Sequence, residues 1–262
     1  MSTVITPIRA VLNHAHALGW CDVPKFMKPK QTEGRTNYLL PAEMRRLVMA
    51  AAPHLKPLLI FLVGTGARMG EALELQWRDV DLVGARATFW GTRINAEGQK
   101  RRGTKGGKRR VARLPPVVVQ ALAALPHRDG TVFRWQTKTP VRPGMAPPRV
   151  SEYADKDRQG GGQIKTAWNG ALRRAGLDVN DGYPRLTPHD LRHTWASWHY
   201  AVHKDLLLLK KEGGWSSVTL VERYAHLLPA GQVVEIAAFW RVGYEVDGHG
   251  VDTGPAADVV TN

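Results

Sequence analysis

The chain has 262 residues, of which 43% are hydrophobic and 23% charged, and this composition is typical of a folded globular protein rather than a disordered one. Lys and Arg number 37 against 23 Asp and Glu, so the net charge is +14, and a polyanion is the expected partner: nucleic acid first, an anionic membrane surface second. The single cysteine, Cys21, excludes a disulfide framework and a cysteine-based zinc site. No apolar run approaches the roughly 18 residues that span a bilayer, and polar residues interrupt the N-terminus, so we expect a soluble, cytoplasmic protein.

The first 24 residues predict one helix and its exit. Thr6 is the expected N-cap, Pro7 suits the first helical position, and Gly19 ends the helix. Residues 25–37 are polar and predict a linker.

Residues 38–240 alternate helical patterns with a few strand-like segments. The expected helices lie at 41–51, 57–63, 68–75, 117–125, 163–175, 187–201, 204–212 and 217–227. Residues 85–90 and 110–114 predict a small antiparallel sheet, whereas 136–162 contain several Pro and Gly and predict a loop. The pattern predicts an α+β fold that is mainly helical, followed at 241–262 by a flexible acidic tail.

A basic cluster without acidic residues occupies residues 100–113. Its cations are Lys100, Arg101, Arg102, Lys105, Lys108, Arg109, Arg110 and Arg113. Such a run is often only a solvated face, but here the turn sequence 104–108 precedes a strand, which predicts a lysine at a hairpin tip. We expect DNA-phosphate contacts from Lys100, Arg101, Arg102, Lys108, Arg109 and Arg110.

Two glycine-rich turns each precede a helical pattern. The first, residues 64–70, has the spacing G-x-G-x-x-x-G, which does not match a dinucleotide-binding loop, and it places Arg68 near the start of a helix. The second, residues 213–217, offers Ser216 or Ser217 as a helix cap. Tyr224 follows at helical spacing, which by itself is more typical of a core residue than of a nucleophile.

Residues 187–193 begin a helix, with Thr187 as the expected cap. His189 and Arg192 are three residues apart and share a face at the helix N-terminus, where backbone amides favour an anion. One alternative is a metal site formed by His189 and His193, but Arg192 would repel the cation and no third ligand is evident. A purely structural helix is the other alternative.

Taken in chain order, these segments resemble the tyrosine recombinase (phage integrase) family over about residues 38–230. Residues 64–82 are similar to its first box, 104–115 to its lysine hairpin, 186–194 to its His-x-x-Arg box and 213–226 to its tyrosine box. The resemblance implies a tyrosine-recombinase-type catalytic domain with Arg68, Lys105, His189, Arg192, Trp215 and Tyr224 as catalytic residues.

The same resemblance implies a role for each of these residues. Tyr224 would attack a backbone phosphodiester and form a 3′-phosphotyrosyl link, without metal or other cofactor. Arg68 and Arg192 would neutralise the phosphate, Lys105 would protonate the leaving 5′-oxygen, and His189 would assist proton transfer or orient the phosphate. Glu71 is the expected residue that orients Arg68.

Two departures from the family pattern stand out. Trp215 replaces the usual histidine, although its indole N–H can still donate to a phosphate oxygen. Residues 1–24 resemble only the last helix of the core-binding domain, which implies that most of this domain is missing.

The function that the resemblance implies is site-specific recombination of double-stranded DNA, with type IB topoisomerase-like relaxation or a non-catalytic DNA-binding remnant as alternatives. The resemblance also implies self-association on DNA, through the C-terminal segment, and nucleoid association when bound.

Overall fold

The computed structural model describes residues 2–22, 36–90, 92–94, 100–102, 109–136, 150–153, 162–225, 227 and 230–242. Contacts divide the chain into two units, Met1–Thr36 and Asn37–Asn262. The predicted linker (25–37) lies outside the described residues except for its last two, and the predicted acidic tail (241–262) except for its first two. Within the described ranges, no helix combines the length and the apolar character needed to cross a membrane.

The first unit contains a single described helix, α1 (Ser2–Ala17). Gly19 follows it with a φ of +74°, as expected of a residue that ends a helix. The predicted start at Thr6 is wrong, because α1 begins at Ser2 and Pro7 lies inside it. A proline in a helix removes one backbone hydrogen bond, and here the helix continues through it.

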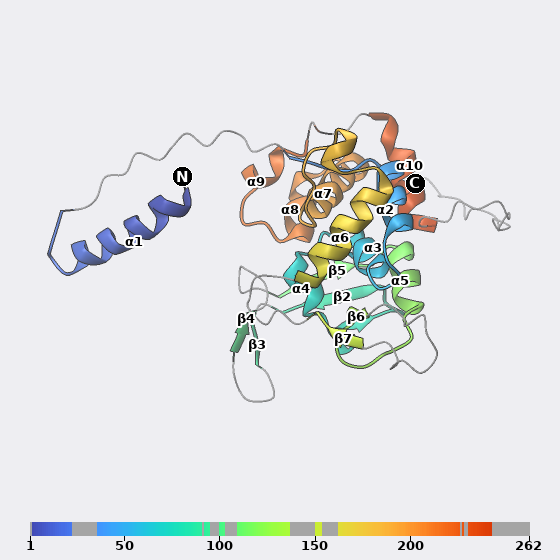
Figure 1. Cartoon of the computed structure of the whole chain (residues 1–262), viewed down its shortest axis with the longest axis horizontal. Coiled ribbons are helices and arrows are strands. Elements are labelled where there is room, and N and C mark those ends of the chain that lie inside the picture. The colour runs from blue at the N-terminus through green and yellow to red at the C-terminus, as the bar shows by residue number, and fades with distance from the viewer. Residues whose placement is uncertain are drawn as a thin grey trace, which may run out of the picture. The chain divides into compact units, whose positions relative to one another are not determined.

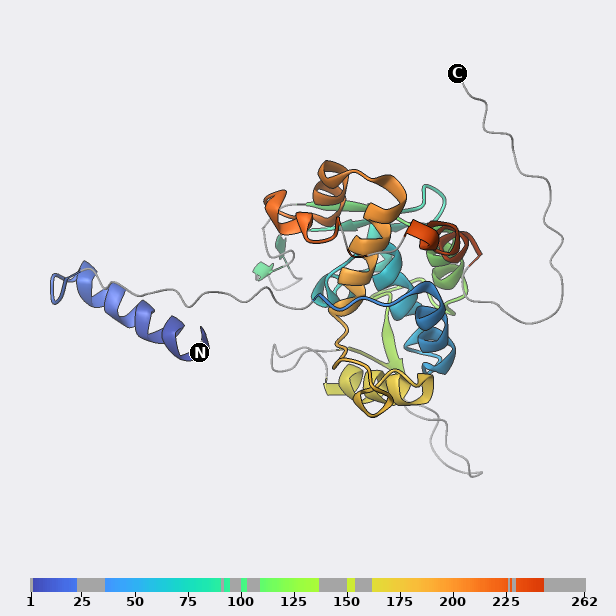
Figure 2. The same ribbon diagram turned by 90° about the horizontal axis from the view of Figure 1, so that it is seen from above.

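The second unit is mainly helical with small antiparallel sheets, as predicted (Figures 1 and 2). Its α-helices are α2 (Pro41–Ala50), α3 (Lys56–Thr65), α4 (Met69–Leu73), α5 (Pro116–Ala123), α6 (Gly162–Ala175), α7 (Asp190–His203), α8 (Leu206–Gly213), α9 (Thr219–Glu222) and α10 (Val233–Val242). Its strands are β1 (Val80–Asp81), β2 (Arg86–Phe89), β3 (Thr92–Ile94), β4 (Lys100–Arg102), β5 (Arg110–Arg113), β6 (Arg134–Gln136) and β7 (Val150–Glu152). Short 3₁₀ turns lie at Trp77–Asp79, Val179–Asp181 and Ala230–Gln232.

Helix α3 forms the centre of the core. Every side chain from Leu58 to Thr65 is buried, as the continuous apolar run predicts. The helix packs against α5 on one side and α7 on another, while α10 packs on both α5 and α7. Because α3 ends within the first glycine-rich segment, at Thr65, the buried helix fixes the backbone that leads to Arg68.

The main sheet has the order β1-β2-β5 with antiparallel pairing. Ala87 pairs with Ala112 and Phe89 with Arg110. In β5 burial alternates, so that Arg110 and Ala112 face inward while Val111 and Arg113 face outward. The strand pattern therefore directs one arginine of the basic cluster into the protein.

Two other strand pairs differ from the sequence expectation. Residues 136–162 were expected to be a loop, yet β7 lies there and pairs with β6. The strands that flank the turn at 104–108, β4 and β5, belong to different sheets, because β4 pairs with β3. The turn itself lies outside the described residues.

Candidate active site

Arg68 is held by the start of α4. The chain leaves α3 through Gly66, whose φ is +60°, and Arg68 then becomes the N-cap of α4. The Glu71 carboxylate accepts a hydrogen bond from the Arg68 backbone N–H at 3.0 Å. Its other oxygen forms an ion pair with the Arg68 guanidinium at 2.6 Å. One carboxylate thus fixes both the backbone and the side chain of Arg68, which agrees with the orienting contact expected of Glu71.

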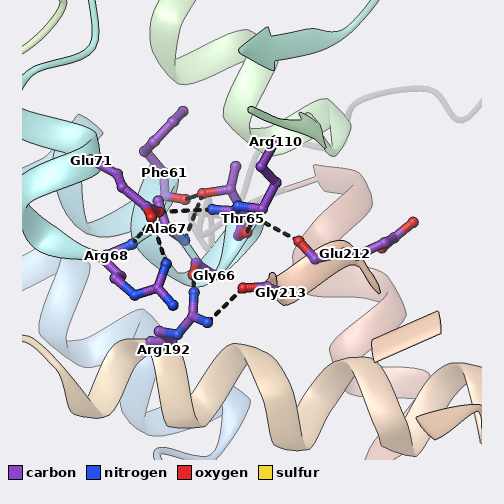
Figure 3. A network of polar contacts seen from close by, with 10 residues as sticks. All are labelled: Phe61, Thr65, Gly66, Ala67, Arg68, Glu71, Arg110, Arg192, Glu212 and Gly213. Atoms are coloured by element: carbon purple, nitrogen blue, oxygen red, sulfur yellow. Dashed lines mark hydrogen bonds and ion pairs between the residues drawn. The ribbon is translucent and has the colours of Figure 1, made fainter. Parts of the chain in front are cut away.

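Glu71 also pairs with a second arginine, Arg110 of β5 (Figure 3). The Arg110 Nη2 lies 3.0 Å from a Glu71 carboxylate oxygen, its Nη1 donates to the Glu212 carbonyl at 2.7 Å, and its guanidinium lies 4.6 Å from the Phe89 ring centre. Burial alone would raise the pKa of the Glu71 carboxyl, but the charge of Arg110 and the hydrogen bonds and charge of Arg68 outweigh it, so this pKa is lowered. Glu71 is therefore ionised at neutral pH and bridges two guanidinium groups.

Arg192 enters the site from α7 and is held by two glycine carbonyls. Its Nη1 donates to the Gly66 carbonyl and its Nη2 to the Gly213 carbonyl, the latter at 2.6 Å (Figure 3). The second carbonyl lies at the C-terminus of α8, next to the Glu212 carbonyl that Arg110 uses. A helix C-terminus carries partial negative charge, so the C-terminus of α8 attracts the guanidinium groups of both Arg110 and Arg192.

Two indole rings explain why these carbonyls belong to glycines. A Cβ on Gly66 would lie 2.2 Å from the Trp195 ring, and one on Gly213 would lie 1.8 Å from the Trp215 ring. The Trp215 ring is also stacked under the Arg192 guanidinium, 4.1 Å from its centre. A larger residue at either glycine would displace an indole ring and so disturb the position of the Arg192 guanidinium.

Positive charge exceeds negative charge in this network. Arg68, Arg110 and Arg192 surround the single carboxylate of Glu71. Burial, and then the charges of Arg68 and Arg110, lower the pKa of Arg192 to about 9. An anion that entered here would relieve this repulsion, so the site favours a negatively charged ligand.

Tyr224 follows α9 and is only 2% exposed. Its phenolic oxygen lies 2.7 Å from Nδ1 of His193, and its ring lies 5.8 Å from that of Trp215. Burial raises the pKa of the Tyr224 phenol, although the charges of Arg223 and Arg192 oppose this rise. The phenol is therefore protonated at neutral pH and needs a proton acceptor before it can act as a nucleophile.

His189 lies at the N-cap of α7, one turn before His193. The two imidazole rings meet edge to face with their centres 5.0 Å apart. Burial, and then the charge of Arg192, lower the pKa of His189. The helix begins at Asp190 rather than at the expected position, but Thr187 still contacts the Asp190 carboxylate through its backbone N–H and its hydroxyl.

The structure brings most of the predicted site residues together. Arg68, Glu71, Arg192, Trp215, Tyr224 and His189 lie in one continuous network of the contacts given above. Lys105 and Lys108 lie outside the described residues. The expected helix at 217–227 is shorter, since α9 spans only Thr219–Glu222 and its N-cap is Val218, not a serine.

The predicted DNA-phosphate residues fall in different settings. Lys100, Arg101 and Arg102 form β4. Arg109 is exposed, with its guanidinium 5.1 Å from the centre of the Trp90 ring. Arg110 requires a correction, because its buried guanidinium is bound to Glu71 and to the Glu212 carbonyl, and this position does not fit a contact at the protein surface.

Two neighbours of the candidate site differ from what the sequence patterns predict. Arg110 belongs to the basic cluster in sequence, although its alternation with Ala112 and Leu114 indicates an inward side chain. For His193 the sequence indicates only a possible metal ligand, because its position beside the tyrosine depends on a contact between residues 31 apart in sequence. Chain spacing within one helix gives no signal of such a pair.

The sequence profile described as "Phage integrase family" matches residues 37–230, and the chain belongs to that family. The chain is 30% identical over 206 residues to the integrase of Salmonella phage P22, covering 79% of this chain and 48% of that protein. It is 28% identical over 173 residues to the tyrosine recombinase XerC of Xanthomonas campestris, covering 66% of this chain and 44% of that protein. The chain thus spans about half the length of these relatives.

Solved structures share the fold. XerA recombinase matches with a TM-score of 0.53 at 22% identity, covering 88% of this chain and 73% of that one. The Tn1549 transposon integrase, solved in complex with a circular intermediate DNA, matches with a TM-score of 0.59 at 16% identity, covering 86% and 74%. The fold of the second unit is therefore that of tyrosine recombinase catalytic domains.

Proposed function

We propose that this chain is a site-specific DNA recombinase that cleaves and rejoins strands through a 3′-phosphotyrosyl intermediate on Tyr224. The observation that supports this most strongly is the cluster in which Arg192 reaches both the Gly66 turn beside Arg68 and the Trp215 ring beside Tyr224. A phosphodiester at this position would meet two guanidinium groups and one phenol. Family membership and the net charge of +14 support DNA as the substrate.

In the proposed reaction the Tyr224 oxygen forms a bond to phosphorus, and the bond from phosphorus to the 5′-oxygen breaks. Arg68 and Arg192 stabilise the charge on the non-bridging oxygens as the transition state forms. Lys105 gives a proton to the leaving 5′-oxygen, because a lysine can release a proton that a guanidinium holds too tightly. Rejoining runs the same steps in reverse, with a 5′-hydroxyl as the attacking group.

We expect this cleavage to need no divalent metal, since Arg68 and Arg192 supply the positive charge that a metal provides in other phosphoryl-transfer enzymes. The test uses a library of duplexes with randomised sequence and a nick near the expected scissile bond. After cleavage the short fragment diffuses away, so the covalent complex accumulates. Incubation in excess EDTA should give a protein–DNA adduct that survives denaturation, with Tyr224 as the modified residue in the mass spectrum.

Other outcomes of this experiment identify the alternatives. Duplex binding without any adduct would contradict the proposal and indicate a non-catalytic DNA-binding protein. Relaxation of supercoiled plasmid without strand exchange between duplexes would indicate a topoisomerase-like activity instead. Loss of the adduct in EDTA, with recovery on addition of Mg²⁺ or Zn²⁺, would revive a metal site at His189 and His193.

A further inference from the structure

The contact between His193 and Tyr224 assigns a step that the predicted residue roles left open. His193 lies within α7, and Tyr224 lies in a turn two residues after the end of α9. The 2.7 Å separation of Nδ1 and the phenolic oxygen is that of a strong hydrogen bond. His189, for which the resemblance implies either a role in proton transfer or one in orienting the phosphate, contacts the His193 ring.

We propose that His193 is the general base of strand cleavage, accepting the phenolic proton of Tyr224 on Nδ1 as the oxygen attacks phosphorus, and returning it on rejoining. This inference rests on the function proposed above. Each proton released in this step has an acceptor. One proton moves from Tyr224 to His193, and another moves from Lys105 to the leaving 5′-oxygen. His189 then contacts the ring of the base and acts as a positioning residue for His193.

The surroundings of His193 suit this role. The charged and titratable groups that face it are His189, Asp190 and Arg192 on α7, and Arg223 and Tyr224 after α9. Burial, and then His189, lower the pKa of His193 to about 4, so the ring is neutral at neutral pH and can accept a proton. The tautomer that accepts from Tyr224 carries its own proton on Nε2.

The arrival of DNA would strengthen this base. An anionic phosphate beside Arg192 stabilises an imidazolium nearby, and so raises the pKa of His193 toward the range where it competes for a phenolic proton. The same phosphate opposes the charges of Arg223 and Arg192, which add to the larger effects of burial and His189 in lowering the pKa of His193 in the free protein. Proton transfer is thereby coupled to occupation of the site by substrate.

The test compares His193→Asn with the unchanged protein in single-turnover cleavage of a nicked duplex recovered from the library. Asparagine places an oxygen near the position of Nδ1 and can accept the hydrogen bond, but it cannot take the proton. We expect adduct formation at pH 7 to slow by about 10²–10⁴-fold, the range for loss of a general base. The variant rate should then rise about tenfold per pH unit above pH 7, with the phenolate fraction, while the unchanged protein varies little.

Two further arms separate a base from a structural residue. Fluorotyrosine at position 224, whose phenol is more acidic, should accelerate the His193→Asn variant much more than the unchanged protein. A duplex with a 5′-bridging phosphorothiolate, whose sulfur leaves without a proton, should not rescue His193→Asn but should rescue Lys105→Ala. The control His203→Asn removes an exposed imidazole at the far end of α7 and should cleave at the normal rate.

Normal cleavage by His193→Asn would overturn the proposal. So would a variant that cleaves slowly but keeps the normal pH profile and is not accelerated by fluorotyrosine at position 224, because that combination indicates a structural role. If the variant fails to fold, nitrogen chemical shifts of His193 in the unchanged protein decide the matter: a proton on Nδ1 would overturn it. Adduct formation by Tyr224→Phe would contradict the proposed function itself, and that result is distinct from any of these.

Discussion

The Tyr224→Phe variant is expected to bind DNA with unchanged affinity and to form no covalent adduct at all. Only the phenolic oxygen is removed, and no other group can make the bond to phosphorus in the proposed reaction. The variant also leaves Nδ1 of His193 without its hydrogen-bond partner in a buried setting, so we expect a loss of about 1 kcal/mol in the free energy of unfolding. Denaturing gels measure the adduct, and fluorescence anisotropy measures binding.

Tyr183→Phe is the matched control for this experiment. The Tyr183 hydroxyl donates to Glu43 at 2.9 Å and accepts from Arg46 at 3.0 Å, so its removal also breaks hydrogen bonds. Tyr183 has no contact with the site network described above, and we expect normal cleavage. Adduct formation by Tyr224→Phe, or its loss in Tyr183→Phe, would place the nucleophile elsewhere.

Glu71→Ala is expected to lower the free energy of unfolding by about 3–5 kcal/mol, because it leaves the buried Arg110 guanidinium without its counter-charge. The same change frees the Arg68 side chain and removes the hydrogen bond at the start of α4. Cleavage should therefore slow even under conditions where the variant remains folded. Urea unfolding at neutral pH measures the stability difference.

Two controls define what this loss means. Glu74→Ala removes an exposed carboxylate at the end of α4, and should cost about 1 kcal/mol or less. The double variant Glu71→Ala/Arg110→Met removes both buried charges and should recover much of the lost stability. A double variant that is no more stable than Glu71→Ala would show that the cost does not come from the unpaired guanidinium.

Sequence patterns predicted the helices well where burial is one-sided or complete. The apolar run at 57–63 became α3, and the two glycine-rich turns mark the ends of α3 and α8. These features depend on neighbours within a few residues. The Arg68–Glu71 contact could also be predicted from the sequence, because residues three apart share a helix face.

The predictions that differ from the structure concern contacts between segments that are distant in sequence. The pairing of β6 with β7 joins strands across residues 137–149, and no local pattern in a Pro- and Gly-rich stretch indicates it. The inward position of Arg110 depends on Glu71 and on the end of α8, which offer the acceptors that make a buried guanidinium tolerable. The approach of His193 to Tyr224 depends on how the segment after α9 folds back onto α7.

The excess of guanidinium groups around Glu71 has a practical consequence for any assay of this protein. Phosphate and sulfate carry the charge and the oxygen geometry that two arginines recognise, so we expect these buffer ions to compete with the phosphodiester of the proposed reaction. Chloride salts at equal ionic strength screen charge equally but lack the oxygen atoms that pair with a guanidinium. If the proposed function is correct, a sulfate buffer that stabilises the protein lowers its apparent affinity for DNA, and cleavage rates measured in different buffers are comparable only at constant phosphate and sulfate concentration.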